Sequence, residues 1–209
     1  GRRRATLGVI ESRPLEASAP PRPAAFCSGC PHNRSTLLGE GQIAGGGIGC
    51  HTMAMRLMDP TRSFSFLTHM GGEGAPWIGM APFVNQGHIF QNIGDGTLFH
   101  SGYLANEACV AAGVNITYKI LYNGHVAMTG GQHATGALPG PEVTRKLEAE
   151  GVKRIVVLSA DVARYETLGP LAANASLRDR SKLLDTLQEL EKIPGVTAIV
   201  YDQECAAEK

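Results

Sequence analysis

The sequence has little that would indicate a secreted, disulfide-stabilised or membrane-spanning protein. Only 5 of its 209 residues are cysteine, an odd number that does not suit a disulfide framework. No apolar run approaches the length of a membrane span, and nothing near Gly1 resembles a signal peptide. Neither sign of charge is in excess, since 19 basic residues balance 19 acidic ones, so neither nucleic acid nor a membrane surface is expected as a partner. We therefore expect a protein of a reducing compartment, the cytoplasm.

The apolar content limits the number of domains. With 43% hydrophobic residues over 209 positions, the chain can bury one α/β core but is too short for two full domains. Residues 1–25 are rich in proline and arginine without a repeat, so we expect an extended linker or arm there and one domain over residues 26–209. Because the sequence lacks an initiator methionine, we also expect a piece of a longer polypeptide.

The most informative stretch lies in the middle of the chain. Ile89–Ile93 predicts a buried strand that runs into Gly-Asp-Gly, a helix is expected over Thr97–Ala112, and Ile116–Tyr122 predicts a second strand. A strand–helix–strand unit is right-handed and parallel, so its two strands end at the same edge of the sheet. Asp95 and Asn123, which follow these strands, are therefore expected side by side.

This edge of the predicted sheet has the chemistry of a phosphate and metal site. Ligands bind at the carboxyl ends of parallel strands, and backbone N–H groups at Thr97 and Leu98 would open a helix that favours phosphate. One carboxylate, one amide oxygen and nearby phosphate oxygens suit Mg²⁺. Because Gly-Asp-Gly alone is common, the alternative is a surface turn in an ordinary strand–helix unit.

The other segments predict the rest of an α/β domain. We expect strands at Gly41–Cys50, Ser63–Thr68, Arg154–Leu158 and Val196–Tyr201, and helices at His51–Met58, Ala75–Val84, Pro141–Glu150 and Leu177–Ile193. Residues 161–175 have no clear pattern. Alternating strands and helices are typical of a mostly parallel, doubly wound sheet with helices on both faces.

Four of the five cysteines fall in loops or at strand ends. Cys27 and Cys30 form a CxxC loop with glycine and proline, Cys50 ends a glycine-rich strand, and Cys205 follows the last strand. A CxxC with two distant cysteines can bind either Zn²⁺ or an iron–sulfur cluster, and spacing alone does not separate the two. Cys109 lies inside the helix after Gly-Asp-Gly, where we expect a small buried side chain.

Several motifs occur together: FCSGCPHN, GGIGCHTM, MGGEGAPW, NIGDGT, AAGVNITYKILYN, AMTGGQ and IPGVTAIVYDQECAAEK. Over about residues 24–209 they resemble the thiamine-diphosphate domain of the fused-chain indolepyruvate ferredoxin oxidoreductases, within the 2-oxoacid:ferredoxin oxidoreductase superfamily. The Gly-Asp-Gly followed by asparagine matches the motif that binds thiamine diphosphate and Mg²⁺ in this family. The resemblance implies the fold of a diphosphate-binding domain.

The resemblance also implies the ligands of each cofactor. The diphosphate would be bound by Gly94, Asp95, Gly96, Thr97, Asn123, His125, Thr129 and Gly130. Its Mg²⁺ would be held by the side chains of Asp95 and Asn123 and by the backbone carbonyl of His125. A [4Fe-4S] cluster would be held by Cys27, Cys30, Cys50 and Cys205, and such a cluster, unlike zinc, can accept the electrons that thiamine chemistry releases.

The activity implied is the oxidative decarboxylation of indolepyruvate or a related arylpyruvate to acyl-CoA, CO₂ and reduced ferredoxin. The partners implied are ferredoxin, coenzyme A, the 2-oxoacid, and a pyrimidine-binding domain elsewhere in the polypeptide or in another subunit. That domain would supply the activating glutamate, so this segment alone would be inactive, and we expect a homo-oligomer. Two alternatives remain: a non-oxidative thiamine-diphosphate decarboxylase module, and a zinc-stabilised domain without catalytic activity.

Four further side chains have no fixed role in the sequence. His32 and His51 lie next to or near the cysteines implied as cluster ligands, and they could donate hydrogen bonds around these ligands or contact the substrate. Glu73 is expected either to contact substrate or cofactor or to be an exposed loop carboxylate. His100 is expected to face either the diphosphate or the solvent.

Overall fold

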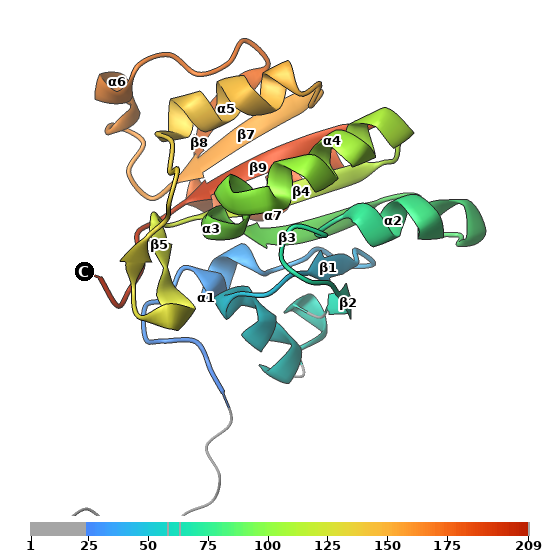
Figure 1. The fold of residues 1–209 in the computed structure, drawn as a ribbon, viewed down its shortest axis with the longest axis horizontal. Coiled ribbons are helices and arrows are strands. Elements are labelled where there is room, and N and C mark those ends of the chain that lie inside the picture. The colour runs from blue at the N-terminus through green and yellow to red at the C-terminus, as the bar shows by residue number, and fades with distance from the viewer. Residues whose placement is uncertain (1–23, 58, 63, 209) are drawn as a thin grey trace, which may run out of the picture.

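A seven-stranded parallel sheet organises the part of the chain that the computed structural model describes, residues 24–57, 59–62 and 64–208. The strand order is β2-β1-β3-β4-β9-β7-β8 (Figure 1). The strands are β1 (Ala44–Gly46), β2 (Phe64–Leu67), β3 (Ile89–Gly94), β4 (Ile116–Tyr122), β7 (Arg154–Ser159), β8 (Ala175–Asp179) and β9 (Val196–Asp202). Every neighbouring pair in this sheet is parallel, which confirms the predicted fold class.

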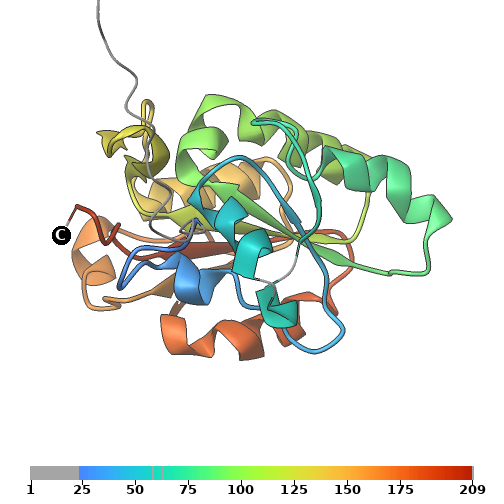
Figure 2. The same cartoon turned by 90° about the horizontal axis from the view of Figure 1, so that it is seen from below.

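Helices cover both faces of the sheet, as the two views show (Figures 1 and 2). One face carries α2 (Ala75–Met80), α4 (Tyr103–Ala112) and α5 (Gly140–Ala149), and the other carries α1 (His32–Ser35), the 3₁₀ helix η1 (Cys50–Leu57) and α7 (Leu183–Leu190). The shorter helical segments are η2 (Pro60–Arg62), η3 (Ala81–Phe83), α3 (Asp95–Thr97), the π turn η4 (Leu98–Gly102), η5 (Ala127–Thr129), α6 (Tyr165–Leu168) and η6 (Arg180–Lys182). None of the described helices is long and apolar enough to cross a membrane.

Strand β4 shows why the domain has two cores. Its residues alternate between the faces, so Ile116, Tyr118 and Ile120 join the core beneath α2, α4 and α5. Thr117 and Lys119 point to the opposite side, and all five side chains are almost fully buried. Each large aliphatic side chain removed from water in this way contributes about 1.5–3 kcal/mol.

The structure corrects the predicted helix at Leu177–Ile193. Residues 175–179 instead form the edge strand β8, which pairs with β7, and the helix α7 begins only at Leu183. Between them the Asp179 carboxylate accepts a hydrogen bond of 2.7 Å from the Ser181 amide and starts a separate 3₁₀ turn. The polar sequence of β8, half exposed at the edge of the sheet, concealed the strand.

The glycine-rich segment before Cys50 is also shorter as a strand than predicted. Only Ala44–Gly46 is extended, and the helix at Cys50–Leu57 is of the 3₁₀ type. A side chain at Gly45 or Gly46 would collide with Phe66 or Phe64 of the neighbouring strand, at 2.8 and 2.4 Å from the ring atoms. Glycine therefore lets the two phenylalanine rings pack over β1.

The predicted arm over residues 1–25 falls almost wholly outside the described residues and stays a prediction. The boundaries of the single domain expected over residues 26–209 also remain a prediction. Within the described part, strands β1 to β4 and β7 to β9 belong to one continuous sheet.

Candidate functional site

Asp95 lies at the carboxyl edge of the sheet, directly after β3. Strands β3 and β4 pair in register up to Gly94 and Leu121, so the segments that follow them lie side by side as predicted. The Asp95 carboxylate accepts hydrogen bonds from the backbone amides of Asn123 (2.9 Å), Gly124 (2.6 Å) and Gly96 (2.8 Å). Burial raises the pKa of Asp95, and these three amides oppose that rise by stabilising the carboxylate.

Asn123 is held in a tight turn that leads into a hairpin. Its side-chain oxygen accepts a hydrogen bond of 2.9 Å from the His125 amide. The hairpin pairs β5 (His125–Val126) with β6 (Gln132–His133) in antiparallel fashion, an element that the sequence did not reveal. A side chain at Gly96 would come within 3.0 Å of Val126, so the hairpin folds directly over the Gly-Asp-Gly turn.

The start of the helix differs from the prediction. The helix begins at Asp95, and the Leu98 amide already donates to the Asp95 carbonyl, so it is not free to bind phosphate. A π turn follows over Leu98–Gly102 before α4 begins. Such turns occur often at functional sites because they redirect the side chains of a helix.

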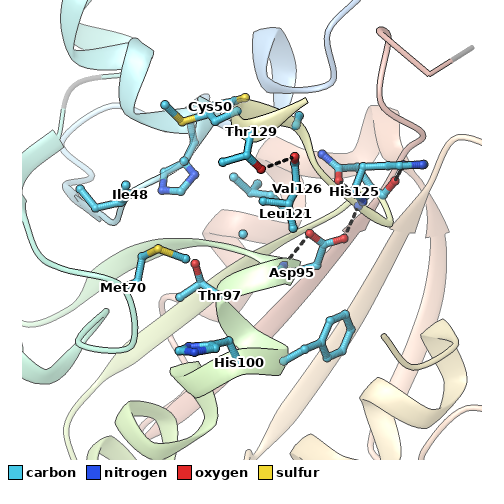
Figure 3. Close-up of a pocket in the computed structure, with 18 of the residues that line it drawn as sticks. Ile48, Cys50, Met70, Asp95, Thr97, His100, Leu121, His125, Val126 and Thr129 are labelled. Atoms are coloured by element: carbon cyan, nitrogen blue, oxygen red, sulfur yellow. Dashed lines mark hydrogen bonds between the residues drawn. The ribbon is translucent and has the colours of Figure 1, made fainter. Parts of the chain in front are cut away.

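A cavity of about 630 Å³ opens above this edge (Figure 3). This size lies within the usual range for pockets that bind cofactors. Its lining includes most of the predicted diphosphate residues, namely Gly94, Asp95, Gly96, Thr97, Asn123, His125 and Thr129. Gly130, the remaining one, is not in the lining, and it takes a positive φ of 113° after η5.

The walls of the cavity include apolar side chains that the sequence analysis did not single out. These are Ile48, Met70, Phe99, Leu121, Val126 and Met128. They come from the glycine-rich loops, the π turn, the end of β4 and the hairpin, so only the folded chain brings them together. The floor is polar around Asp95 while these walls are apolar, and the site therefore suits a ligand with one charged and one apolar end.

The cysteines predicted to share a metal centre lie near the same edge. The CxxC forms a turn in which the Cys30 amide donates to the Cys27 carbonyl at 3.1 Å, and Cys50 lines the cavity. Burial and, to a smaller extent, the neighbouring thiols of Cys30, Cys205 and Cys27 together raise the pKa of Cys50 to about 11. Burial likewise raises the pKa of Cys30, with smaller effects of Cys27 and Cys205. Cys27 and Cys205 are therefore close enough to Cys30 and Cys50 to affect the pKa values of these two thiols.

This arrangement does not form a ready site for a single ion. Among residues 24–57, 59–62 and 64–208, no group of three or more His, Cys, Asp or Glu side chains is positioned to hold one metal ion. A cluster of iron and sulfide is larger than an ion, so its ligands stand further apart. Binding would also offset the cost of forming thiolates in a buried site, because a metal-bound thiol is deprotonated.

Cys109 is separate from these thiols, as predicted. It is buried within α4, and its sulfur lies 3.3 Å from the Tyr118 hydroxyl. That hydroxyl donates to the Glu73 carbonyl at 2.8 Å. Cys109 thus belongs to the core beneath α4.

The histidines of uncertain role all line the cavity. His32 and His51 are buried, and burial lowers their pKa values to about 4 and about 3, so both are neutral near pH 7. The Gly47 amide donates to Nε2 of His51 at 3.1 Å, which fixes the orientation of this ring. His100 is exposed at the rim, and its Nδ1 lies 3.0 Å from the Ser101 hydroxyl.

Glu73 is neither an exposed carboxylate nor part of the cavity lining. Its side chain is buried, and one oxygen accepts a hydrogen bond of 2.7 Å from the Gly71 amide. A side chain at Gly47 would stand 2.3 Å from the other oxygen. Glu73 therefore joins two glycine-rich loops behind the site, those of Gly71 and Gly47. Because the two loops are separate in the sequence, local sequence does not predict this contact.

Comparison with known proteins agrees with this geometry. The family described as "Thiamine pyrophosphate enzyme, C-terminal TPP binding domain" matches residues 47–193, well over half of the chain. The chain is 28% identical over 208 residues to an indolepyruvate oxidoreductase subunit IorA from Archaeoglobus fulgidus, covering 95% of this chain and 31% of the relative. It is 30% identical over 163 residues to the protein of the same name from Methanothermobacter marburgensis, covering 73% of this chain and 26% of that protein. The chain thus spans about a third of the length of the curated relatives it matches.

A solved structure extends the comparison to the fold. The 2-oxoglutarate:ferredoxin oxidoreductase from Magnetococcus marinus superposes with a TM-score of 0.62 at 19% identity, covering 89% of this chain and 66% of that one. At this identity the likeness concerns the fold. The sheet order, the Gly-Asp-Gly turn beside Asn123 and the family match agree, and the chain belongs to the thiamine pyrophosphate enzymes, of which it contains the C-terminal cofactor-binding domain.

Proposed function

We propose that this chain is the diphosphate- and cluster-binding part of a 2-oxoacid:ferredoxin oxidoreductase. The reaction proposed is the oxidative decarboxylation of indolepyruvate or a related arylpyruvate to acyl-CoA, CO₂ and reduced ferredoxin. One observation carries the proposal: Asp95 and Asn123 share the floor of a cavity whose wall contains Cys50. The names of the relatives, indolepyruvate oxidoreductase subunits, support the substrate class.

The polar floor of the cavity fits a magnesium diphosphate. Asp95 Oδ2 accepts two backbone hydrogen bonds and Oδ1 accepts one, so Oδ1 retains a lone pair that a cation can use. Asn123 and the backbone carbonyl of His125 are the further oxygen ligands in the proposal, with Gly94, Gly96, Thr97, Thr129 and Gly130 around the phosphates. Thiamine diphosphate, when bound, supplies the nucleophilic carbon that attacks a 2-oxoacid.

The apolar walls suit the rest of the ligand and its substrate. Ile48, Met70 and Met128 are partly exposed side chains in the cavity wall, and methionine adapts its shape readily to aromatic groups. They would exclude water from the reacting end of the cofactor and contact an aryl side chain. The neutral rings of His32 and His51 add hydrogen-bonding groups to this wall without adding charge.

The thiols of Cys27, Cys30, Cys50 and Cys205 would hold a [4Fe-4S] cluster. The effect of the Cys27 and Cys205 thiols on the pKa values of Cys30 and Cys50 supports a shared centre. With Cys50 in both the cavity wall and this group, an electron acceptor would lie next to the cofactor.

The rest of the enzyme would come from outside this chain. Because the chain spans 31% of its Archaeoglobus fulgidus relative, ample sequence remains there for a pyrimidine-binding domain that supplies the activating glutamate. The further partners proposed are ferredoxin, coenzyme A and a second copy of the protein in a cytoplasmic homo-oligomer.

The test uses the full-length protein that contains this chain, purified without oxygen. We expect stoichiometric iron and sulfide, binding of thiamine diphosphate that depends on Mg²⁺ in calorimetric titrations, and reduction of a viologen dye that requires both indolepyruvate and coenzyme A. Release of CO₂ from indolepyruvate without dye reduction would instead identify a non-oxidative decarboxylase. A colourless protein with stoichiometric zinc and no cofactor binding would identify a domain without catalytic activity.

A further inference from the structure

Lys119 is a fully buried lysine on the central strand β4. Its side chain is 1% exposed, on the face of the sheet opposite α4, and its ammonium group donates a hydrogen bond of 2.9 Å to the Leu37 carbonyl. Lysine is almost never buried to this extent unless its charge has a partner. Thr117, the neighbour on the same face, pairs its hydroxyl with that of Thr197 at 2.7 Å and with Nε2 of His88 at 2.9 Å, so it is engaged away from the ammonium.

No carboxylate accompanies this lysine among the described residues. The ion pairs of that part of the chain are Arg62–Asp59, Arg164–Asp202, Arg178–Glu189 and Lys182–Asp185. Burial alone lowers the pKa of Lys119 to about 7. A buried ammonium with a single carbonyl acceptor is costly unless something negative lies nearby.

The segments around Lys119 lead to the cluster cysteines. Leu37 follows α1, the short helix that begins directly after the CxxC loop, and α1 packs on β4. His51, the residue next to Cys50, packs edge to face on His32 of α1, with ring centroids 6.3 Å apart. Lys119 therefore lies behind two of the loops that carry the thiols.

His51, which lies between these loops, does not supply a positive charge. Its Nε2 accepts a hydrogen bond from the Gly47 amide at 3.1 Å, so this nitrogen carries no proton and the ring is neutral. The cation that these loops cover is Lys119.

We propose that Lys119 is the buried counter-charge of the iron–sulfur cluster held by Cys27, Cys30, Cys50 and Cys205, and that it raises the reduction potential of this cluster. This inference rests on the proposed function. Four thiolates give such a cluster a net negative charge, and reduction adds one electron and one more negative charge. A buried ammonium attracts the reduced form more strongly than the oxidised form. Because the permittivity of the protein interior is low, this attraction is screened less than it would be in water. The step transfers one electron to the cluster and needs no proton.

The test is a potentiometric titration of the anaerobically purified full-length protein, followed by low-temperature electron paramagnetic resonance. Lys119→Met removes the charge at nearly constant volume. We expect it to retain its iron and to lower the equilibrium constant for cluster reduction about tenfold, which is about 59 mV for a one-electron couple. Lys146→Met is the matched control, because Lys146 is exposed on the other face of the sheet, over the ring of Tyr103, and its loss should leave the potential unchanged.

Each outcome decides between the two proposals. A cluster with the same potential in wild type and Lys119→Met overturns the role of Lys119 and leaves the proposed function intact. A wild-type protein without iron–sulfur signals overturns both. Should Lys119→Met lose its iron, Lys119→Arg separates charge from packing: iron retained in the arginine variant supports the counter-charge, and iron lost in both variants refutes it.

Discussion

Replacing Asp95 should separate its proposed binding of Mg²⁺ from its joining of β3 to β4. Its carboxylate accepts hydrogen bonds from the amides of Gly96, Asn123 and Gly124. Asp95→Ala leaves all three amides without their acceptor, whereas Asp95→Asn keeps one oxygen that can still face the amides of Asn123 and Gly124. The two variants therefore differ mainly in their effect on the fold.

The magnitudes follow from these contacts. A buried amide that loses its acceptor lowers the free energy of unfolding by about 1–3 kcal/mol. The loss should be smaller here, because all three residues are half-buried and water can replace part of the lost hydrogen bonding. We expect Asp95→Ala to lower the free energy of unfolding by about 2–4 kcal/mol and Asp95→Asn by about 1 kcal/mol. Both variants remove the charged ligand that we propose for the cation. Two unit charges 4 Å apart attract by about 4 kcal/mol at an effective permittivity of 20, so we expect the affinity for magnesium thiamine diphosphate to fall at least about 100-fold in both.

The assays are urea unfolding of the cofactor-free protein and calorimetric titration of thiamine diphosphate with Mg²⁺. Asp185→Asn is the control, since Asp185 is an exposed carboxylate on α7 and undergoes the same chemical change. Unchanged cofactor affinity in Asp95→Asn would refute the magnesium site. Equal unfolding free energies for Asp95→Ala and wild type would show that the three amide contacts contribute nothing to the junction of the strands.

Three further predictions concern the thiols, the buried lysine and the glycine-rich loops. Cys205→Ser should lower the iron and sulfide content of the protein while Cys109→Ser leaves it unchanged; the reverse pattern in iron analysis would refute the assignment. Because the pKa of Lys119 in the folded, iron-free protein is lowered from 10.5 to about 7, the unfolded state binds more protons between these values, and the destabilisation is full below pH 7. The urea midpoint should therefore rise between pH 7 and 10 more in wild type than in Lys119→Met, and parallel profiles would contradict this. Gly47→Ala should cost about 1–3 kcal/mol because its Cβ meets Glu73, and much of this loss should disappear in the Glu73→Ala background, as a double-mutant cycle would measure.

The position of Asp95 beside Asn123 could be predicted because it depends on local rules. An apolar strand, a crossover helix and a second apolar strand have one handedness, which places both strand ends at one edge whatever the rest of the chain does. The pairing of β3 with β4 and the contact between Asp95 and Asn123 confirm this reasoning. The buried position of Cys109 followed similarly from its place in a helix between these strands.

Other features depend on contacts between distant segments and left no local signal. The hairpin of β5 and β6 consists of strands of two residues, too short to show any periodicity. Glu73 is buried because Gly47, far away in the sequence, leaves room for it. Lys119 lies on a face of β4 that other segments cover. The sequence of β4 alone does not show that this lysine is buried, because the burial depends on the distant segment around Leu37. The strand β8 was missed because an edge strand need not be apolar.

The strand order has a consequence for how the protein is made on the ribosome. Strand β9 lies between β4 and β7, although it is the last of these strands to be synthesised. Until Val196–Asp202 leaves the exit tunnel, the unit β1–β4 and the unit β7–β8 have no shared partner, and each exposes an apolar edge that invites aggregation. Cys205 emerges three residues later, so the closing of the sheet and the completion of the thiol set are nearly the same event during synthesis. Insertion of iron before that moment would find only part of the thiol set, so the proposed cluster would be assembled after translation of this domain.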